Sequence, residues 1–195
     1  MSNVRFIDKD LSNIDFIKKR IELKELRLVG VREAFRELQF EKFSESDMEF
    51  FKDFYFTTKG EDRVFHKNMI LHAFIFQCSQ YDLKDFFLTA FKKLRHLDIR
   101  LTAIRGYAHY ATEAEVILLM DKFLASLIKL PEHTPYAYQE YESIRSQFGL
   151  GYLVERYGYD CFKKALEQTN QQYEAMPENF RSIIRMDENG FTTRL

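Results

Sequence analysis

Apolar residues recur at three- and four-residue spacing in the N-terminal part of the chain, which is typical of helices that bury one face. Ser12 and Asn13 precede this pattern and are typical of a helix start. Because Gly30 interrupts the pattern, and Gly in a helix interior costs about 1 kcal/mol relative to Ala, we expect two helices broken near Gly30 rather than one long helix. The apolar positions are Ile14, Ile17, Ile21, Leu28, Val31, Phe35 and Leu38.

A further helix is expected to begin within the polar run of residues 44–47. Ser46 followed by Glu49 fits a capping box, in which each residue hydrogen-bonds the backbone of the other. Apolar residues between Met48 and Tyr55 would form the buried face of this helix. The polar residues 57–62 then predict a loop.

Residues 69–94 align with residues 102–127 at an offset of 33, and similar residue types coincide along both stretches. Ala73 falls on Gly106, and Leu83 falls on Val116. Each copy predicts a helix, a short turn and a second helix. Internal offsets in the thirties are typical of stacked helical hairpins.

Residues 97–108 contain an Asp followed seven residues later by an Arg on an Ala-containing helix, namely Asp98 and Arg105. This stretch resembles the first helix of HEAT repeats, and the likeness extends over about 60 residues. The first copy departs from the pattern, because His72 stands where Arg105 would be. The resemblance implies an α-α superhelix that serves as a binding scaffold, and it implies no catalytic activity.

We therefore predict an all-α fold of about nine to eleven helices, stacked as antiparallel hairpins into a HEAT-like superhelix or a compact helical array. The scarcity of Gly (7) and Pro (3) agrees with long helices. The predicted organisation is a single domain over residues 1–195. Residues 1–60 would be capping helices, residues 61–176 the repeat core, and residues 177–195 a partly frayed segment.

The charges are balanced, 29 basic against 30 acidic, so the net charge of -1 provides no general attraction to nucleic acid or to anionic lipid. No signal peptide or membrane-spanning stretch is evident, and we expect a cytoplasmic protein without a membrane partner. Cys78 and Cys161 lie in apolar surroundings, and we expect two buried thiols in a reducing compartment.

Motifs for catalysis and cofactor binding are missing from the sequence. The five histidines are scattered without an HExxH or ExxH spacing, and each is expected to be a half-buried or surface residue. No phosphate-binding glycine motif or nucleophile motif occurs. We therefore predict no catalytic residue, metal or cofactor, and we favour a protein that is not an enzyme.

Tyrosine is unevenly distributed, and arginines are interleaved with the tyrosines. Tyr and Arg are enriched at binding hot spots because each combines a large contact area with a polar tip. Eight of the 11 tyrosines lie between residues 107 and 159: Tyr107, Tyr110, Tyr136, Tyr138, Tyr141, Tyr152, Tyr157 and Tyr159. The predicted binding residues are Arg105, Tyr107, His109, Tyr110, Tyr138, Tyr141, Arg145 and Arg156.

The leading hypothesis is a non-enzymatic protein-binding module, and its small size and near-neutral charge also resemble the immunity or antitoxin partner of a secreted toxin. A second hypothesis is an enzyme or small-ligand binder with a closed cleft between His109, Tyr110 and Arg145. A third is a HEAT-like nucleic-acid binder, which the charge balance disfavours. It would use the basic residues Lys92, Lys93, Arg95, His96, Arg100 and Arg105.

Overall fold

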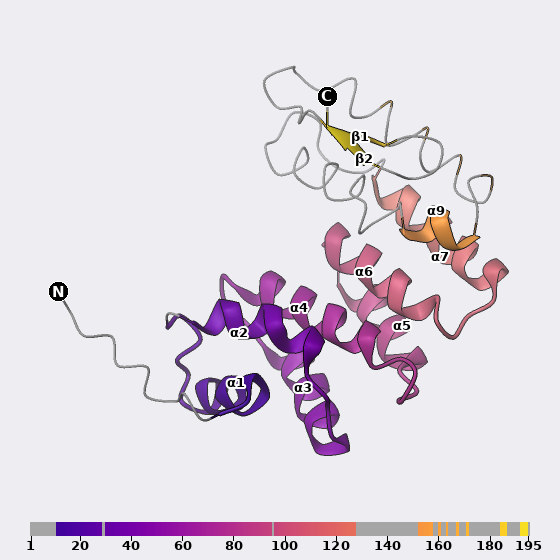
Figure 1. Ribbon diagram of the computed structural model, residues 1–195. Helices are drawn as coiled ribbons and strands as arrows, with labels where there is room; N and C mark the ends of the chain where they lie inside the picture. Colours follow the sequence, from indigo (N-terminus) through magenta and orange to yellow (C-terminus); the bar gives the residue numbers. More distant parts are fainter. Residues whose placement is uncertain are drawn as a thin grey trace. The chain divides into compact units, whose positions relative to one another are not determined.

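The computed structural model describes residues 11–28, 30–94, 96–127, 152–157, 184–186 and 192–194, together with the single helical positions Asp160, Lys163, Glu167 and Gln171. The fold class is all-α, as predicted (Figure 1). The chain divides into two compact units, Met1–Tyr81 and Asp82–Leu195. The predicted single domain with its three regions stays a prediction.

Unit 1 is built from four α-helices and one 3-10 turn within its described residues. They are α1 (Asn13–Glu22), α2 (Val31–Glu37), η1 (Leu38–Phe40), α3 (Glu45–Thr57) and α4 (Arg63–Phe76). α1 packs on α2, while α4 packs against η1, α2 and α3. The centre of this unit is rich in aromatic rings, and its largest fully buried side chains include Phe35, Phe51, Tyr55 and Phe74.

The predicted helix start at Ser12 and the predicted break near Gly30 are both confirmed. The Ser12 hydroxyl accepts a hydrogen bond from the Asp15 backbone N–H and caps α1. α1 ends at Glu22, and α2 begins directly after Gly30. Gly30 has φ +91°, a conformation that glycine adopts without the steric cost of a Cβ atom.

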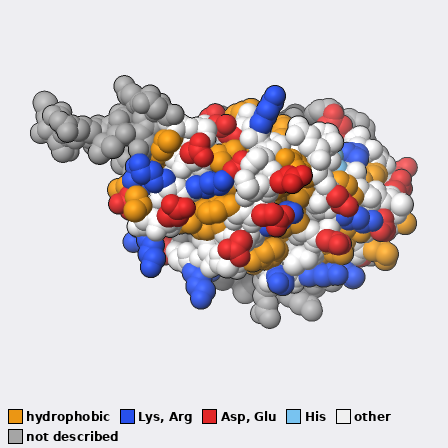
Figure 2. Space-filling view, turned by 90° about the horizontal axis from the view of Figure 1, so that it is seen from below, with side chains coloured by type: hydrophobic (Ala, Val, Ile, Leu, Met, Phe, Trp, Pro, Cys, Tyr) orange, Lys and Arg blue, Asp and Glu red, His pale blue; other side chains and the backbone are white. Residues whose placement is uncertain are grey.

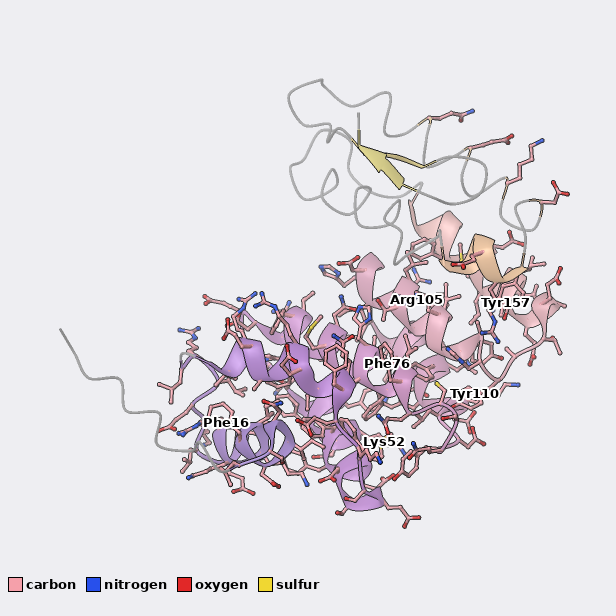
Figure 3. All side chains as sticks on the ribbon, in the orientation of Figure 1. Phe16, Lys52, Phe76, Arg105, Tyr110 and Tyr157 are labelled. Atoms are coloured by element: carbon pink, nitrogen blue, oxygen red, sulfur yellow. The ribbon has the colours of Figure 1, made fainter. Side chains whose placement is uncertain are left out.

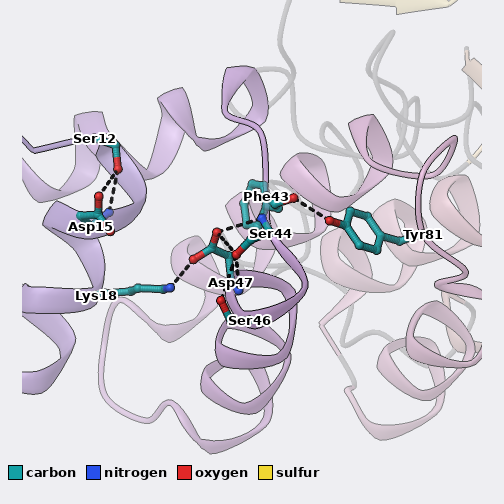
Figure 4. Close-up of polar contacts among 8 residues, drawn as sticks. All are labelled: Ser12, Asp15, Lys18, Phe43, Ser44, Ser46, Asp47 and Tyr81. Carbon is teal, nitrogen blue, oxygen red and sulfur yellow. Dashed lines mark hydrogen bonds and ion pairs between the residues drawn. The ribbon is translucent and has the colours of Figure 1, made fainter.

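The capping box of α3 lies two residues earlier than the sequence predicted (Figure 4). Ser44, not Ser46, is the N-cap: its hydroxyl accepts from the Asp47 backbone N–H at 3.2 Å, and the Asp47 carboxylate accepts from the Ser44 backbone N–H at 2.9 Å. Lys18 of α1 also pairs with Asp47. Glu49 instead pairs with Lys52, so the predicted Ser46–Glu49 box is wrong.

Unit 2 contains α5 (Lys84–Lys93), α6 (Leu97–Tyr107), α7 (Glu113–Leu127) and α9 (Tyr152–Tyr157). Each copy of the offset-33 repeat therefore has the predicted helix–turn–helix order, α4 then α5 and α6 then α7. Within unit 2, α5 packs on α6, and α6 packs on α7. Stacking into a HEAT-like superhelix stays a prediction.

Two short strands, β1 (Ile184–Met186) and β2 (Thr192–Arg194), pair antiparallel with Ile184 opposite Arg194. They lie within the segment that was expected to fray and that was predicted without a strand. Strands of three residues are too short to produce a readable alternation of apolar and polar positions. Among the described residues, none of the helices combines the length and the apolar character needed to cross a membrane.

Candidate functional site

Five of the eight predicted binding residues lie within the described part of unit 2. Arg105 and Tyr107 belong to the last turn of α6, His109 and Tyr110 follow it in the turn before α7, and Arg156 belongs to α9. Tyr138, Tyr141 and Arg145 lie outside the described residues. The predicted cleft between His109, Tyr110 and Arg145 therefore stays untested.

Tyr107 is an internal residue, with 5% of its surface exposed. Its hydroxyl donates a hydrogen bond to Glu115 Oε1 of α7 at 3.3 Å, and Lys84 Nζ of α5 lies 5.5 Å from the centre of its ring. Its pKa is raised, first by burial and then by the negative charge of Glu115. These contacts give Tyr107 a role in packing the three helices.

Glu115 is the centre of the polar network that joins these helices. Its Oε2 accepts from the Thr112 backbone N–H at 2.8 Å, which caps α7, and its Oε1 lies 3.2 Å from Lys84 Nζ. Hydrogen bonds from the Thr112 backbone and from Lys84 lower the pKa of Glu115 to about 2. Glu115 is therefore part of the N-terminal cap of α7, since its own backbone N–H also donates to the Thr112 hydroxyl at 3.4 Å.

The end of α6 and the helix α9 are held side by side by a hydrogen bond. The Tyr157 hydroxyl donates to the Ala108 carbonyl oxygen at 3.0 Å, and the Arg156 guanidinium lies 5.6 Å from the centre of the Tyr157 ring. Arg105, Tyr110 and Tyr157 are labelled in Figure 3. This contact brings Arg156 to the same end of α6 as Arg105 and His109.

Two arginines and a histidine gather at this end of α6, and we call Arg105, His109 and Arg156 the basic cluster. Arg105 is 8% exposed, whereas His109 and Arg156 are exposed to solvent. The pKa of the His109 imidazole is lowered, first because neighbouring atoms displace part of its water and then because of the charges of Arg156 and Arg105. Two guanidinium groups beside an imidazole make such a cluster favourable for a bound carboxylate, whose negative charge would in turn favour the protonated imidazole.

The sequence did not predict Tyr157 as the residue that attaches α9 to α6. Nor did it predict the exposure of Phe40 at 73% and Phe76 at 58% in unit 1. Phe40 precedes Glu41, and Phe76 precedes Gln77. The Glu41 carbonyl oxygen accepts a hydrogen bond from Gln77 Nε2 at 3.0 Å, so each exposed phenylalanine is next in sequence to one partner of this bond. Apolar periodicity indicates which face of a helix is apolar, but it does not show whether another element covers that face.

The basic residues predicted for the nucleic-acid-binding alternative differ in their exposure to solvent. Lys92 and Lys93 are exposed, but the Arg100 guanidinium lies 4.3 Å from the centre of the Phe91 ring, and burial lowers its pKa. Arg105 is buried, and Arg95 lies outside the described residues. On the face shown in Figure 2, acidic, basic and apolar side chains are interspersed.

Within the described ranges, no group of three or more His, Cys, Asp or Glu residues is arranged to hold a metal ion. Cys78 is only half-buried, in contrast to the expectation, and its thiol lies 3.5 Å from the Phe74 carbonyl oxygen. Cys161 lies outside the described residues. His66 also differs from expectation, because it is 2% exposed rather than a half-buried or surface residue.

No protein-family model, curated protein or solved structure matches this chain.

Proposed function

We propose that this chain is a non-enzymatic protein-binding module whose partner places acidic side chains on the basic cluster. The observation that supports the proposal is the gathering of Arg105, His109 and Arg156 at one end of α6, beside the half-buried Tyr110. Arg and Tyr are the residue types that most often supply binding energy in protein interfaces.

The different exposure of the three side chains of the basic cluster suits recognition. Arg105 is held within the unit and would lose little side-chain freedom on binding, while His109 and Arg156 remain open to solvent. An acidic group that approaches them would offset the positive charge of the arginines and favour the protonated form of His109. Electrostatic complementarity of this kind mainly raises the association rate and selects the partner.

The HEAT-like scaffold belongs to the same proposal, because α6 and α7 form a helical hairpin of the kind that presents binding residues in such repeats. We also propose a cytoplasmic location and, as the class of partner, a toxin that this protein would bind as an immunity or antitoxin protein. The small size of 195 residues and the near-neutral charge support this class. A partner with nuclease or peptidase activity would support it directly.

The test is affinity purification from the native host with three full-length proteins. They are the wild type, a His109→Glu/Arg156→Glu variant and a Lys92→Glu control, which reverses an exposed charge of α5 outside the basic cluster. We expect one partner with the wild type and the control, and its loss with the double variant. A partner retained by all three would show that the basic cluster is not the binding site, and no partner with any would contradict the binding module.

A further inference from the structure

His66 lies on α4 in the aromatic centre of unit 1, and only 2% of its surface is exposed. The Phe35 ring of α2 stacks on its imidazole, with ring centres 4.5 Å apart and planes at 28°. Phe65 and Phe54 lie 5.7 Å and 6.3 Å away, measured between ring centres. The imidazole therefore occupies a position that would suit another phenylalanine.

Neither ring nitrogen of His66 has a hydrogen-bond partner among the described residues, although both are buried. A neutral imidazole carries one N–H donor and one nitrogen acceptor, so two polar atoms are withdrawn from water without replacement. A protonated imidazole would bury two donors and a full charge, at a greater cost. This environment therefore selects the neutral ring.

The charges around His66 come from α2 and from α4 itself. Asp62, the N-cap of α4, favours a protonated imidazole, but its carboxylate is paired with Arg32 of α2 at 3.1 Å. The guanidinium groups of Arg32 and Arg36 lie 4.3 Å and 5.7 Å from the centre of the Phe65 ring, and Arg36 is itself paired with Glu33 of α2 at 3.5 Å. Among the described residues Asp62 favours the protonated ring more than Arg32 opposes it, so burial rather than the balance of these charges lowers the pKa of His66.

Toward α3, the described residues around His66 are aromatic and basic. α3 contributes the Phe54 ring to His66, and its next residue, Tyr55, is buried beside Lys67 of α4, whose Nζ lies 5.4 Å from the Tyr55 ring centre. Burial, then the charge of Arg63, lowers the pKa of Lys67. Burial likewise lowers the pKa of His66, with Asp62 opposing the shift and Arg32 adding to it.

We propose that His66 is an acid-sensitive switch, which allows α2, α3 and α4 to pack closely only while its ring is neutral. When unit 1 opens, the imidazole becomes hydrated and regains an ordinary pKa near 6.5. The open state then binds a proton that the closed state does not bind. The contribution of the neutral His66 ring to the stability of the closed state is therefore present above the ordinary histidine pKa and is lost as the pH falls below it. The equilibrium constant for opening then rises about tenfold for each unit by which the pH falls.

The test is hydrogen exchange of the full-length protein between about pH 7.5 and about pH 5, corrected for the intrinsic exchange rate and read by mass spectrometry. We expect protection of α2, α3 and α4 to fall about tenfold per pH unit below the ordinary histidine pKa. A His66→Phe variant should lose this dependence. As a matched control, His109→Phe removes a histidine of unit 2 and should retain it.

Two results would overturn the proposal. One is a His66→Phe variant that shows the same pH dependence of exchange in α2, α3 and α4 as the wild type. The other needs no variant: a ring proton resonance of His66 that titrates near the ordinary pKa while the spectrum stays that of the closed protein. The second measurement remains decisive even if His66→Phe does not fold.

Discussion

Gly106 of α6 lies directly against the ring of Phe87 of α5, so closely that a Cβ atom on Gly106 would lie 2.2 Å from ring carbon Cε1. Phe87 is fully buried, and its ring cannot move into solvent. We predict that Gly106→Ala destabilises the protein by about 1–3 kcal/mol, the usual cost of overpacking a core. The gain of up to about 1 kcal/mol in helix propensity from Ala does not offset it. Denaturant unfolding measures the difference.

The Gly106→Ala prediction has a control in the partner residue. In a Phe87→Leu background the smaller side chain leaves room for the methyl group, so Gly106→Ala should cost less there than in the wild type. A double-mutant cycle gives this coupling directly. A Gly106→Ala variant as stable as the wild type would show that α5 and α6 separate easily.

The capping box of α3 makes a second prediction about stability. Ser44→Ala removes the hydroxyl that accepts from the Asp47 backbone N–H, and should cost about 1 kcal/mol. Ser46→Ala is the matched control, because it makes the same substitution at the position that the sequence favoured, and it should cost clearly less. The reverse order in denaturant unfolding would restore the Ser46–Glu49 box.

The error at this cap shows what a sequence leaves undecided. Residues 44–49 offer a serine followed three residues later by an acid in two registers, Ser44 with Asp47 and Ser46 with Glu49. Local pattern fits both. The choice follows from tertiary contact, because Lys18 of α1 pairs with Asp47. Helix positions were predictable from periodicity and from Gly30, since these signals are local.

The candidate site could be predicted only in part for the same reason. The interleaved Tyr and Arg residues predicted Arg105, His109 and Arg156 as binding residues, and the structure brings these three together. The same pattern included Tyr107, which faces Glu115 inside unit 2. His66 carried no local signal at all, because its burial depends on helices that are distant in sequence.

Removing the Tyr107 hydroxyl should weaken the contact between α6 and α7. Tyr107→Phe keeps the ring and loses the 3.3 Å hydrogen bond to Glu115, so we expect a loss of about 0.5–1.5 kcal/mol in unfolding free energy. The control is the same substitution in a Glu115→Gln background, where the carboxylate that accepts this hydrogen bond is already gone and the loss should be smaller. Equal losses in the two backgrounds would contradict a role for the bond between Tyr107 and Glu115.

The network around Glu115 also predicts a pH dependence. The pKa of Glu115 is about 2, below its ordinary value of 4.5, so its contribution to stability is present above about pH 4.5 and is lost as the pH falls toward about 2. The half-exposed position of Glu115 reduces the size of the effect. Glu115→Gln should flatten the stability profile in this range relative to the wild type. An unchanged profile would show that the carboxylate is not held in the network.

The basic cluster can be tested without a partner, through the charge that Arg156 imposes on His109. Arg156→Gln removes one of the two positive charges that lower the pKa of the His109 imidazole, so this pKa should rise toward its ordinary value. Lys92→Gln is the control, because it removes an exposed positive charge outside the basic cluster, and it should leave the value unchanged. Titration of the His109 ring protons by NMR measures the pKa in the wild type and in both variants.

Because salt screens interactions between exposed charges, the difference in the pKa of His109 between the wild type and Arg156→Gln should shrink at high ionic strength. A His109 that titrates alike in all three proteins would place Arg156 away from it and remove the basis for an acidic partner at this site.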